Sequence, residues 1–236
     1  MPISSYPERK TYVAFLDISG FKEMMKREEE AARALDRFYT TVYNVGRDLL
    51  RTNTEMHVSV DAIVVSDCAV LFSRNSDQEV DRINGLRSIL LFTQRVNRDL
   101  IRSSPSLMTT CSIDYGEFKY EDRIEFDHIG KEYFVGQPYL NAFLDNDYGK
   151  PKIQPGQCRL IKKNIAAHNK LPMESPFSLL EDAGKYYYFY WMLDSLADLE
   201  RFKQEYQNTY QLKYTGMISV LQRFAANAQG NRQLHR

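Results

Sequence analysis

YVAFLDISGFKEMM, at residues 12–25, is the stretch that most constrains the fold of this chain. Its first residues are apolar, with aromatic and β-branched members, which predicts a buried strand. Asp17, Ser19 and Gly20 follow where the strand ends, and a helical pattern begins after them. A carboxylate beside a glycine turn can bind a cation and a phosphate together. The alternative is that Asp17 or Ser19 only caps the helix.

The composition is that of an ordinary globular protein. The chain has 236 residues, of which 43% are hydrophobic and 26% charged, so it can bury a substantial core. Its 31 basic and 31 acidic side chains cancel, which leaves no overall field to attract nucleic acid or an anionic membrane. We therefore expect neither nucleic acid nor a membrane as a partner.

The cysteines and the N-terminus indicate a cytoplasmic protein. Cys68, Cys111 and Cys158 are widely spaced in strand-like contexts, which favours small buried hydrophobes in a reducing compartment over metal ligands. The opening MPISSYPERK lacks the apolar core of a signal peptide. No later stretch is apolar and long enough to span a bilayer.

Apolar spacing predicts the order of the elements. A helical pattern covers residues 21–51, in which KREEEAAR is either a solvated face or a break between two helices. The β-branched run at 57–74 is interrupted by Ser66 and Asp67, which predicts a tight hairpin with Asp67 at or next to the turn. The further elements expected are helices at 77–102 and 136–147 and strands at 107–120 and 124–129.

Strand, helix, strand, strand, helix, strand is the ferredoxin-like order, a mostly antiparallel sheet with helices on one face. We therefore expect an α+β fold. In this topology the first strand is central and lies beside the strand that begins the first hairpin. Asp17 and Asp67 then reach the same end of the sheet.

More strands and helices are expected after this core. Strands are predicted at 157–161, 177–180 and 186–193, followed by helices from residue 196. Six consecutive aromatics at 186–191 resemble a base-stacking surface, but no basic residues alternate with them, so a strand buried on both faces is favoured. The domain boundaries we expect are a domain at 1–194 with its core at 11–146, a helical extension at 195–228, and a disordered tail at 229–236.

Two aspartates facing each other near a glycine turn form a candidate site for two divalent cations, with the Ile18 carbonyl as a further oxygen ligand. Such a pair of metal ions activates an attacking oxygen and neutralises a leaving one in a displacement at phosphorus. The alternative is that Asp67 is only a turn residue.

Four motifs, taken in order, resemble those of the class III nucleotide cyclases. FLDISGF at 15–21 is similar to the family signature F-x-D-I-x-G-F, and SDCAVLF at 66–72 to the second-metal motif, usually G-D-x-x-x-x-F. SIDYGEF, around Gly116, resembles the family's glycine strand, and GQPYLNAF at 136–143 its G-x-x-V-N-x-A helix. Order and spacing agree across residues 11–146.

The resemblance implies a class III cyclase core and a reaction. A nucleoside triphosphate would bind with two Mg²⁺ or Mn²⁺ ions at Asp17, Asp67 and the Ile18 carbonyl. Its 3′-hydroxyl would attack the α-phosphorus, giving a 3′,5′-cyclic nucleotide and pyrophosphate. A head-to-tail homodimer with interfacial sites is also implied. The amides that would hold the triphosphate are those of Ile18, Ser19, Gly20 and Phe21.

Several family positions carry other residues here. The purine-reading lysine of adenylate cyclases falls on Ile63, which cannot donate a hydrogen bond, and the partner base-reading position falls on Tyr133. An adenine or guanine reader is therefore disfavoured. The transition-state Asn and Arg positions fall on Leu140 and Leu144, which puts the family's usual catalytic pair in doubt.

Other residues are candidates for these roles. Asn141 lies one residue from the Asn position, and Lys185 precedes the aromatic strand and is a candidate for the missing cation. Tyr43 and Tyr133 are candidates for stacking on the base, with a place in the core as the alternative for each.

A compact class III cyclase with SDC in place of GD, and without the purine-reading pair, is similar to the pyrimidine cyclases of bacterial Pycsar antiphage systems. That resemblance implies conversion of UTP to cyclic UMP, with cyclic CMP from CTP as the alternative, and a separate effector that senses the product. Two rival interpretations are a degenerate cyclase-homology module that binds nucleotide without chemistry and a purely structural ferredoxin-like domain.

Overall fold

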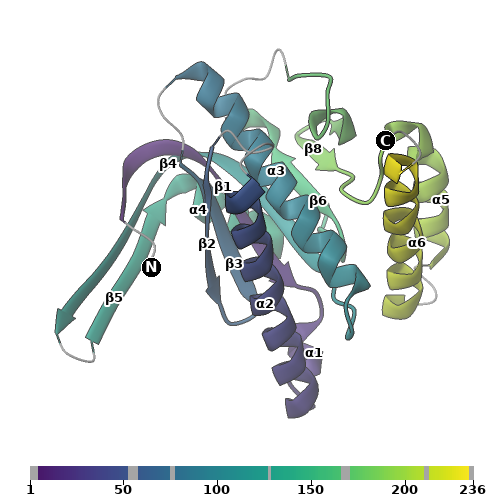
Figure 1. Cartoon of the computed structure of the whole chain (residues 1–236), viewed down its shortest axis with the longest axis horizontal. Coiled ribbons are helices and arrows are strands. Elements are labelled where there is room, and N and C mark those ends of the chain that lie inside the picture. The colour runs from purple at the N-terminus through teal and green to yellow at the C-terminus, as the bar shows by residue number, and fades with distance from the viewer. Residues whose placement is uncertain are drawn as a thin grey trace.

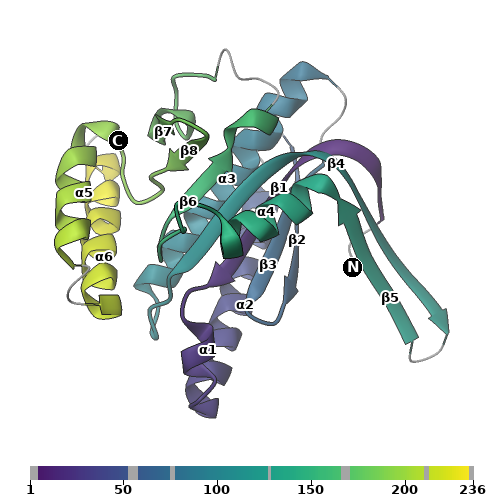
Figure 2. The same cartoon turned by 180° about the vertical axis from the view of Figure 1, so that it is seen from behind.

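A β-sheet with helices on both faces dominates the structure, a computed structural model that describes residues 5–52, 58–74, 78–126, 129–165, 171–209 and 213–233 (Figures 1 and 2). The strands are β1 (Tyr6–Ile18), β2 (Val60–Val65), β3 (Cys68–Ser73), β4 (Thr109–Phe126), β5 (Ile129–Gly136), β6 (Cys158–Ile161), β7 (Leu180–Ala183) and β8 (Tyr186–Phe189). The α-helices are α1 (Phe21–Met24), α2 (Glu28–Thr52), α3 (Glu79–Arg102), α4 (Gln137–Tyr148), α5 (Leu199–Asn208) and α6 (Lys213–Gln233).

The strand order is β2-β3-β1-β4-β6-β8-β7, with β5 paired to β4. Its first four strands have the ferredoxin-like order, which confirms the predicted fold class. The expected neighbour of β1 was wrong, since β1 pairs with β3 and not with β2. Asp17 and Asp67 still reach the same end, because β3 begins at Cys68, directly after Asp67, and runs antiparallel to β1.

Strand β1 is buried on both faces, as its apolar run predicted. Tyr12 and Ala14 belong to the larger hydrophobic cluster, while Val13 and Phe15 belong to a smaller cluster on the opposite face. Successive side chains of a strand point to opposite faces. Asp17 continues the series of Val13 and Phe15, so its carboxylate lies on the face of the smaller cluster.

Helices cover both faces of the sheet. Helices α2 and α3 lie over one face, and α4 lies over the other (Figures 1 and 2). The expectation of helices on one face only was therefore wrong. Tyr139 and Ala142 of α4 pack on the smaller cluster, which would otherwise expose Phe72 and Phe118 to water.

The helical pattern after β1 is broken. Helix α1 ends at Met24, and α2 begins at Glu28 with three acidic residues in its first turn. Negative charge near a helix N-terminus is favourable. Of the two interpretations of KREEEAAR, the break is therefore the one observed.

Strands β6, β8 and β7 extend the sheet beyond β4. The expected strand at 177–180 was displaced, because residues 177–179 form the 3₁₀ helix η2 (Phe177–Leu179) and pairing begins at Leu180. Strand β8 covers the first four residues of the aromatic run, so the strand expected at 186–193 is shorter than predicted. The run is largely buried and forms no exposed surface for nucleic acid, with these residues below one tenth exposed: Tyr186, Tyr187, Phe189 and Trp191.

Helices α5 and α6 share the larger core, to which they contribute Phe202, Leu221 and Ala225. Helix α6 continues to Gln233, which lies within the stretch where a disordered tail was expected, and the last three residues lie outside the described residues. The division between domain and extension stays a prediction. None of the described helices combines the length and apolarity that a membrane span requires.

All three cysteines are free. Cys111 and Cys158 are buried and directly paired between β4 and β6, in agreement with a packing role. Cys68 is half-buried at the start of β3, where its thiol donates to the Val65 carbonyl at 3.1 Å.

Candidate active site

Asp17 and Asp67 meet at one end of the sheet. Asp17 is the penultimate residue of β1, and Asp67 occupies the two-residue turn between β2 and β3. The turn is tight because Ser66 adopts a left-handed conformation with φ of 54°. The Ile18 amide donates to the Asp67 carbonyl at 2.9 Å, which ties the turn to the end of β1.

The Asp17 carboxyl lies among negative charges. Burial, followed by the charges of Asp67 and Asp147, raises the pKa of Asp17 to about 7. Within the part of the chain that the structure describes, no basic side chain forms an ion pair with Asp17. A cation bound here would therefore relieve electrostatic repulsion.

A cavity of about 530 Å³ opens beside Asp17. This volume suits a small molecule. Residues from β1, β4, α4 and the loop after α4 line it, among them Phe15, Asp17, Thr110, Phe143, Asn146, Asp147 and Lys152.

The glycine turn offers fewer amides than the sequence predicted. The Ile18 amide donates to Asp67, and the Ser19 amide donates to the Met108 carbonyl at 2.8 Å, so both are already used within the fold. The backbone amides of Gly20, which has φ of 79°, and of Phe21 remain as candidates to donate hydrogen bonds to a phosphate. The Ser19 hydroxyl is buried at the cavity and has no hydrogen-bond partner among the described residues.

Lys152 supplies a positive charge to this cavity. The sequence analysis did not identify it. Among the described residues that line the cavity, Lys152 is the only basic one. The sequence candidate Lys185 lies in the turn between β7 and β8, 4.9 Å from the centre of the Tyr186 ring, and does not line the cavity. No motif marks Lys152 or Asp147, which lie in a loop and at the end of α4.

A buried ion pair fixes the loop that carries Lys152. Arg159 is fully buried, and its Nε donates to Asp145 Oδ2 at 2.8 Å. Its Nη1 donates to the Pro151 carbonyl at 2.6 Å, directly before Lys152. Asp145 also accepts a hydrogen bond from the Tyr186 hydroxyl at 2.6 Å. Arg159 thus joins the end of α4 to the loop.

Asn141 faces β4 and not Asp17. Its Nδ2 donates to Asp114 Oδ2 at 2.7 Å, and the same oxygen accepts from Asn164 at 3.0 Å. Asp114 is fully buried, and burial raises its pKa. The structure therefore does not bring Asn141 to the Asp17 cavity within one chain.

The three residues considered for reading the base also lie outside the cavity. Ile63 is buried in the smaller hydrophobic cluster. Tyr133 pairs with Glu121 in the β4–β5 hairpin, which projects from the body of the sheet (Figure 1). Tyr43 is 69% exposed on α2, so the alternative of a core position is wrong for it.

The outer face of α4 is apolar. Leu140, Leu144 and Tyr148 recur every four residues and are 45%, 42% and 72% exposed. Phe143, on the same helix, lines the Asp17 cavity. An exposed apolar row of this kind is typical of a face that another surface covers.

No family model matches the chain, and no curated protein matches it.

Solved structures do match. The monomeric guanylyl cyclase domain of the RhoGC fusion protein from the aquatic fungus Blastocladiella emersonii has a TM-score of 0.55 and 11% identity, over 79% of this chain and 97% of that chain. The guanylate cyclase domain of RhGC from Catenaria anguillulae in complex with GTP has a TM-score of 0.53 and 11% identity, over 79% and 98%. A bacterial light-regulated adenylyl cyclase has a TM-score of 0.51 and 12% identity, over 86% and 59%.

At such low identities the likeness concerns the fold alone, since one fold can carry many functions. The chain therefore has the fold of class III nucleotide cyclase domains.

Proposed function

We propose that this chain is a nucleotide cyclase that converts a nucleoside triphosphate to a 3′,5′-cyclic nucleotide and pyrophosphate. The observation that carries the proposal is that Asp17 lies close enough to Asp67 to be affected by its charge and has no basic partner among the described residues. Asp17 also lines a cavity together with Lys152. Carboxylates for cations and a cation for phosphate are the groups that this chemistry requires.

The aspartate pair fits divalent ions, Mg²⁺ or Mn²⁺. A bound cation would offset the negative charges that raise the pKa of Asp17, and a bound ligand could supply a hydrogen-bond partner for the Ser19 hydroxyl. Mg²⁺ is often bound by one or two carboxylates, with water and phosphates supplying the rest. No cluster of three or more His, Cys, Asp or Glu suited to a metal occurs among the described residues, so the other ligands would be the Ile18 carbonyl, water and substrate. Two bound ions would polarise the phosphates and acidify the attacking hydroxyl.

The protein groups would bind and orient the triphosphate. Lys152 would pair with the phosphates, and the Gly20 and Phe21 amides would donate to them. The bond from the 3′-oxygen to the α-phosphorus forms as the bond to the bridging oxygen of pyrophosphate breaks. The hydroxyl proton leaves to water. Arg159 would keep Lys152 in place through the Pro151 carbonyl.

We infer UTP as the substrate, with CTP as the alternative. Ile63 and Tyr133 occupy the positions that the resemblance assigns to purine recognition, and Ile63 is enclosed by apolar residues. A site without the hydrogen-bonding partners of a base loses both affinity and specificity for it. One related structure holds GTP, but at 11% identity its base preference does not transfer to this chain.

Base preference is tested by incubating the protein with each of the four nucleoside triphosphates and Mn²⁺, followed by mass spectrometry. We expect cyclic UMP to be the main product. A product that is chiefly cyclic AMP or cyclic GMP would overturn the argument from Ile63 and Tyr133.

A homodimer would complete the site. The apolar row of Leu140, Leu144 and Tyr148 lies beside the cavity and suits a second copy. Leu144→Asp should give a monomer with little activity in light scattering and turnover assays. Val80→Asp is the matched control, because Val80 is also apolar and exposed, at 57%, on α3. Full activity of a monomeric Leu144→Asp variant would contradict an interfacial site.

The product would act as a second messenger in antiphage defence, sensed by a separate effector in the cytoplasm. The resemblance to pyrimidine cyclases supports this role. Cells that express the wild-type chain should accumulate cyclic UMP after phage infection, whereas cells with Asp67→Asn should not. Equal levels in both would contradict the role.

A second candidate is a nucleotide-binding module without catalysis. Its support is that Leu140 and Leu144 stand at the expected Asn and Arg positions and that Asn141 is engaged by Asp114. This module would be stabilised by UTP with Mn²⁺ and yield no product.

A further inference from the structure

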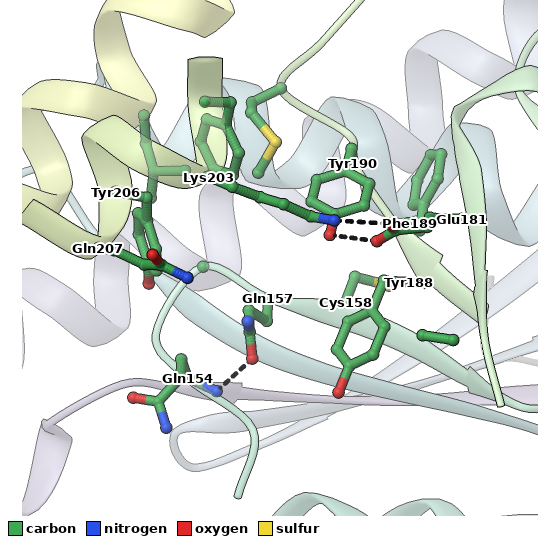
Figure 3. Close-up of a pocket in the computed structure, with 15 residues that line it drawn as sticks. Gln154, Gln157, Cys158, Glu181, Tyr188, Phe189, Tyr190, Lys203, Tyr206 and Gln207 are labelled. Atoms are coloured by element: carbon green, nitrogen blue, oxygen red, sulfur yellow. Dashed lines mark hydrogen bonds and ion pairs between the residues drawn. The ribbon is translucent and has the colours of Figure 1, made fainter. Parts of the chain in front are cut away.

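A second cavity, of about 450 Å³, lies between β6, β8 and helix α5 (Figure 3). Its walls are mostly aromatic and aliphatic, formed by Tyr188, Phe189, Phe202, Tyr206 and Leu221. Cavities of this size and character hold small molecules with aromatic rings. The cavity is distinct from the one beside Asp17, although Gln154 lines both.

The charges that line this cavity neutralise each other. Glu181 accepts a hydrogen bond from the Tyr190 hydroxyl at 2.8 Å, and it forms an ion pair with Lys203 (Figure 3). Burial and this hydrogen bond raise the pKa of Tyr190, so its hydroxyl remains a donor. Lys203 is the only basic residue among the described residues that line the cavity. Because Lys203 is already paired, a bound phosphate would be repelled by the Glu181 carboxylate and would have no free cation to pair with.

Two side-chain amides face each other across the cavity. Gln157 Oε1 accepts from the Gln154 backbone amide at 2.7 Å, which fixes the orientation of its side chain. The Gln157 nitrogen is therefore the end available to a ligand. The Gln207 amide, from α5, points toward it (Figure 3). Amide donors and acceptors match the edge of a nucleobase, which carries ring nitrogens, carbonyls and amino groups.

We propose that this cavity binds an uncharged nucleoside, with its base between the aromatic walls and its edge on Gln157 and Gln207. Stacking on aromatic side chains and hydrogen bonds to side-chain amides are general means of holding a base. The neutralised Glu181–Lys203 pair excludes the phosphate of a nucleotide. This inference does not rest on the proposed cyclase activity.

Trp191 provides a fluorescence readout through the loop at Gly156. It is the only tryptophan of the chain, and it is buried beside the cavity. Its Nε1 donates at 2.7 Å to the carbonyl of Gly156, a residue that lines the cavity. A ligand that contacts this loop should change the emission of Trp191. Excitation at the red edge of the tryptophan band avoids absorption by nucleosides.

The full chain is titrated with uridine, cytidine, adenosine and guanosine up to about 1 mM while Trp191 emission is recorded. We expect a saturable change with at least one nucleoside, and binding of its 5′-monophosphate that is at least about 10-fold weaker. The absence of a saturable change with all four would overturn the proposal. Equal or tighter binding of the monophosphate would also overturn it.

A pair of variants on the same helix locates the site. Gln207→Leu should weaken binding about 10-fold by removing one hydrogen-bonding group. Gln204→Leu makes the same change at an exposed position of α5 that does not line the cavity, and binding should be unchanged. Equal affinities of the two variants would overturn the proposal. Loss of binding in Asp17→Asn with retention in Gln207→Leu would place the nucleoside in the other cavity and overturn it as well.

Discussion

Two aspartates, Asp17 and Asp145, lie on neighbouring segments and have opposite surroundings. Asp145 accepts hydrogen bonds from Arg159 and Tyr186. Asp17 is repelled by Asp67 and Asp147, and no described basic side chain pairs with it. A buried carboxylate with full pairing holds a structure together, whereas one without pairing costs stability until a ligand compensates it. Asp145 therefore anchors the loop after α4, whereas Asp17 has the surroundings expected of the proposed binding site.

The largest expected effect is on catalysis. Asp17→Asn and Asp67→Asn should each lower turnover by at least about 10⁴-fold, because the carboxylates that would bind the divalent ions are lost. Circular dichroism should show an intact fold. Asp198→Asn, an exposed aspartate in a surface ion pair, is the control and should keep full turnover. If Asp17→Asn and Asp67→Asn both remain active, the contrast between Asp17 and Asp145 has no functional meaning.

Loss of the Arg159–Asp145 ion pair should lower the stability of the fold. Arg159→Met should lower the free energy of unfolding by about 3 to 5 kcal/mol, because it leaves Asp145 buried without its ionic partner. Denaturant titration measures this loss. Arg33→Met removes an exposed pair with Glu29 and should cost at most about 1 kcal/mol. Similar losses in the two variants would contradict the anchoring role.

Lys152 connects the two regions, since the anchored loop presents it to the cavity. Lys152→Met should lower kcat/KM about 100-fold through loss of one phosphate-binding cation, without a change in thermal stability. Lys150→Met is a matched control, because Lys150 is exposed on the same loop and does not line the cavity. Equal kcat/KM values for the two variants would show that Lys152 does not bind the substrate.

The smallest effect concerns pH. The pKa of Asp17 rises from 3.8 to about 7 on folding, so the folded protein binds this proton more tightly than the unfolded chain does. The resulting stability is full below about pH 4 and is lost as the pH rises through 7. In metal-free buffer at pH 8, where the Asp17 carboxyl is ionised, Asp17→Asn should therefore be more stable than wild type. If calorimetry finds the variant less stable than wild type at this pH, the proposed repulsion of Asp17 by Asp67 and Asp147 is contradicted.

The sequence predicted the part of the fold that local pattern controls. The run from Tyr12 to Leu16 is continuously apolar, because a central strand is covered on both faces. Ser66 and Asp67 marked the hairpin, because a two-residue turn favours such residues. Together with the ferredoxin-like order of the elements, those two features predicted that Asp17 and Asp67 lie at one end of the sheet.

The rest of the site depends on contacts between distant segments. Lys152 lies in a loop whose position follows from Arg159 and Asp145, and no local pattern encodes that ion pair. Asn141 shows a different limit. Successive helix residues are rotated by about 100°, so one step from Leu140 turns the side chain from solvent toward Asp114.

The most direct test of the central claim is a product analysis of UTP incubated with the wild-type chain and Mn²⁺. The proposed reaction at Asp17 and Asp67 predicts cyclic UMP and pyrophosphate in equal amounts, and neither product with Asp67→Asn. The appearance of UMP or UDP in place of cyclic UMP, or equal product from Asp67→Asn, would contradict it.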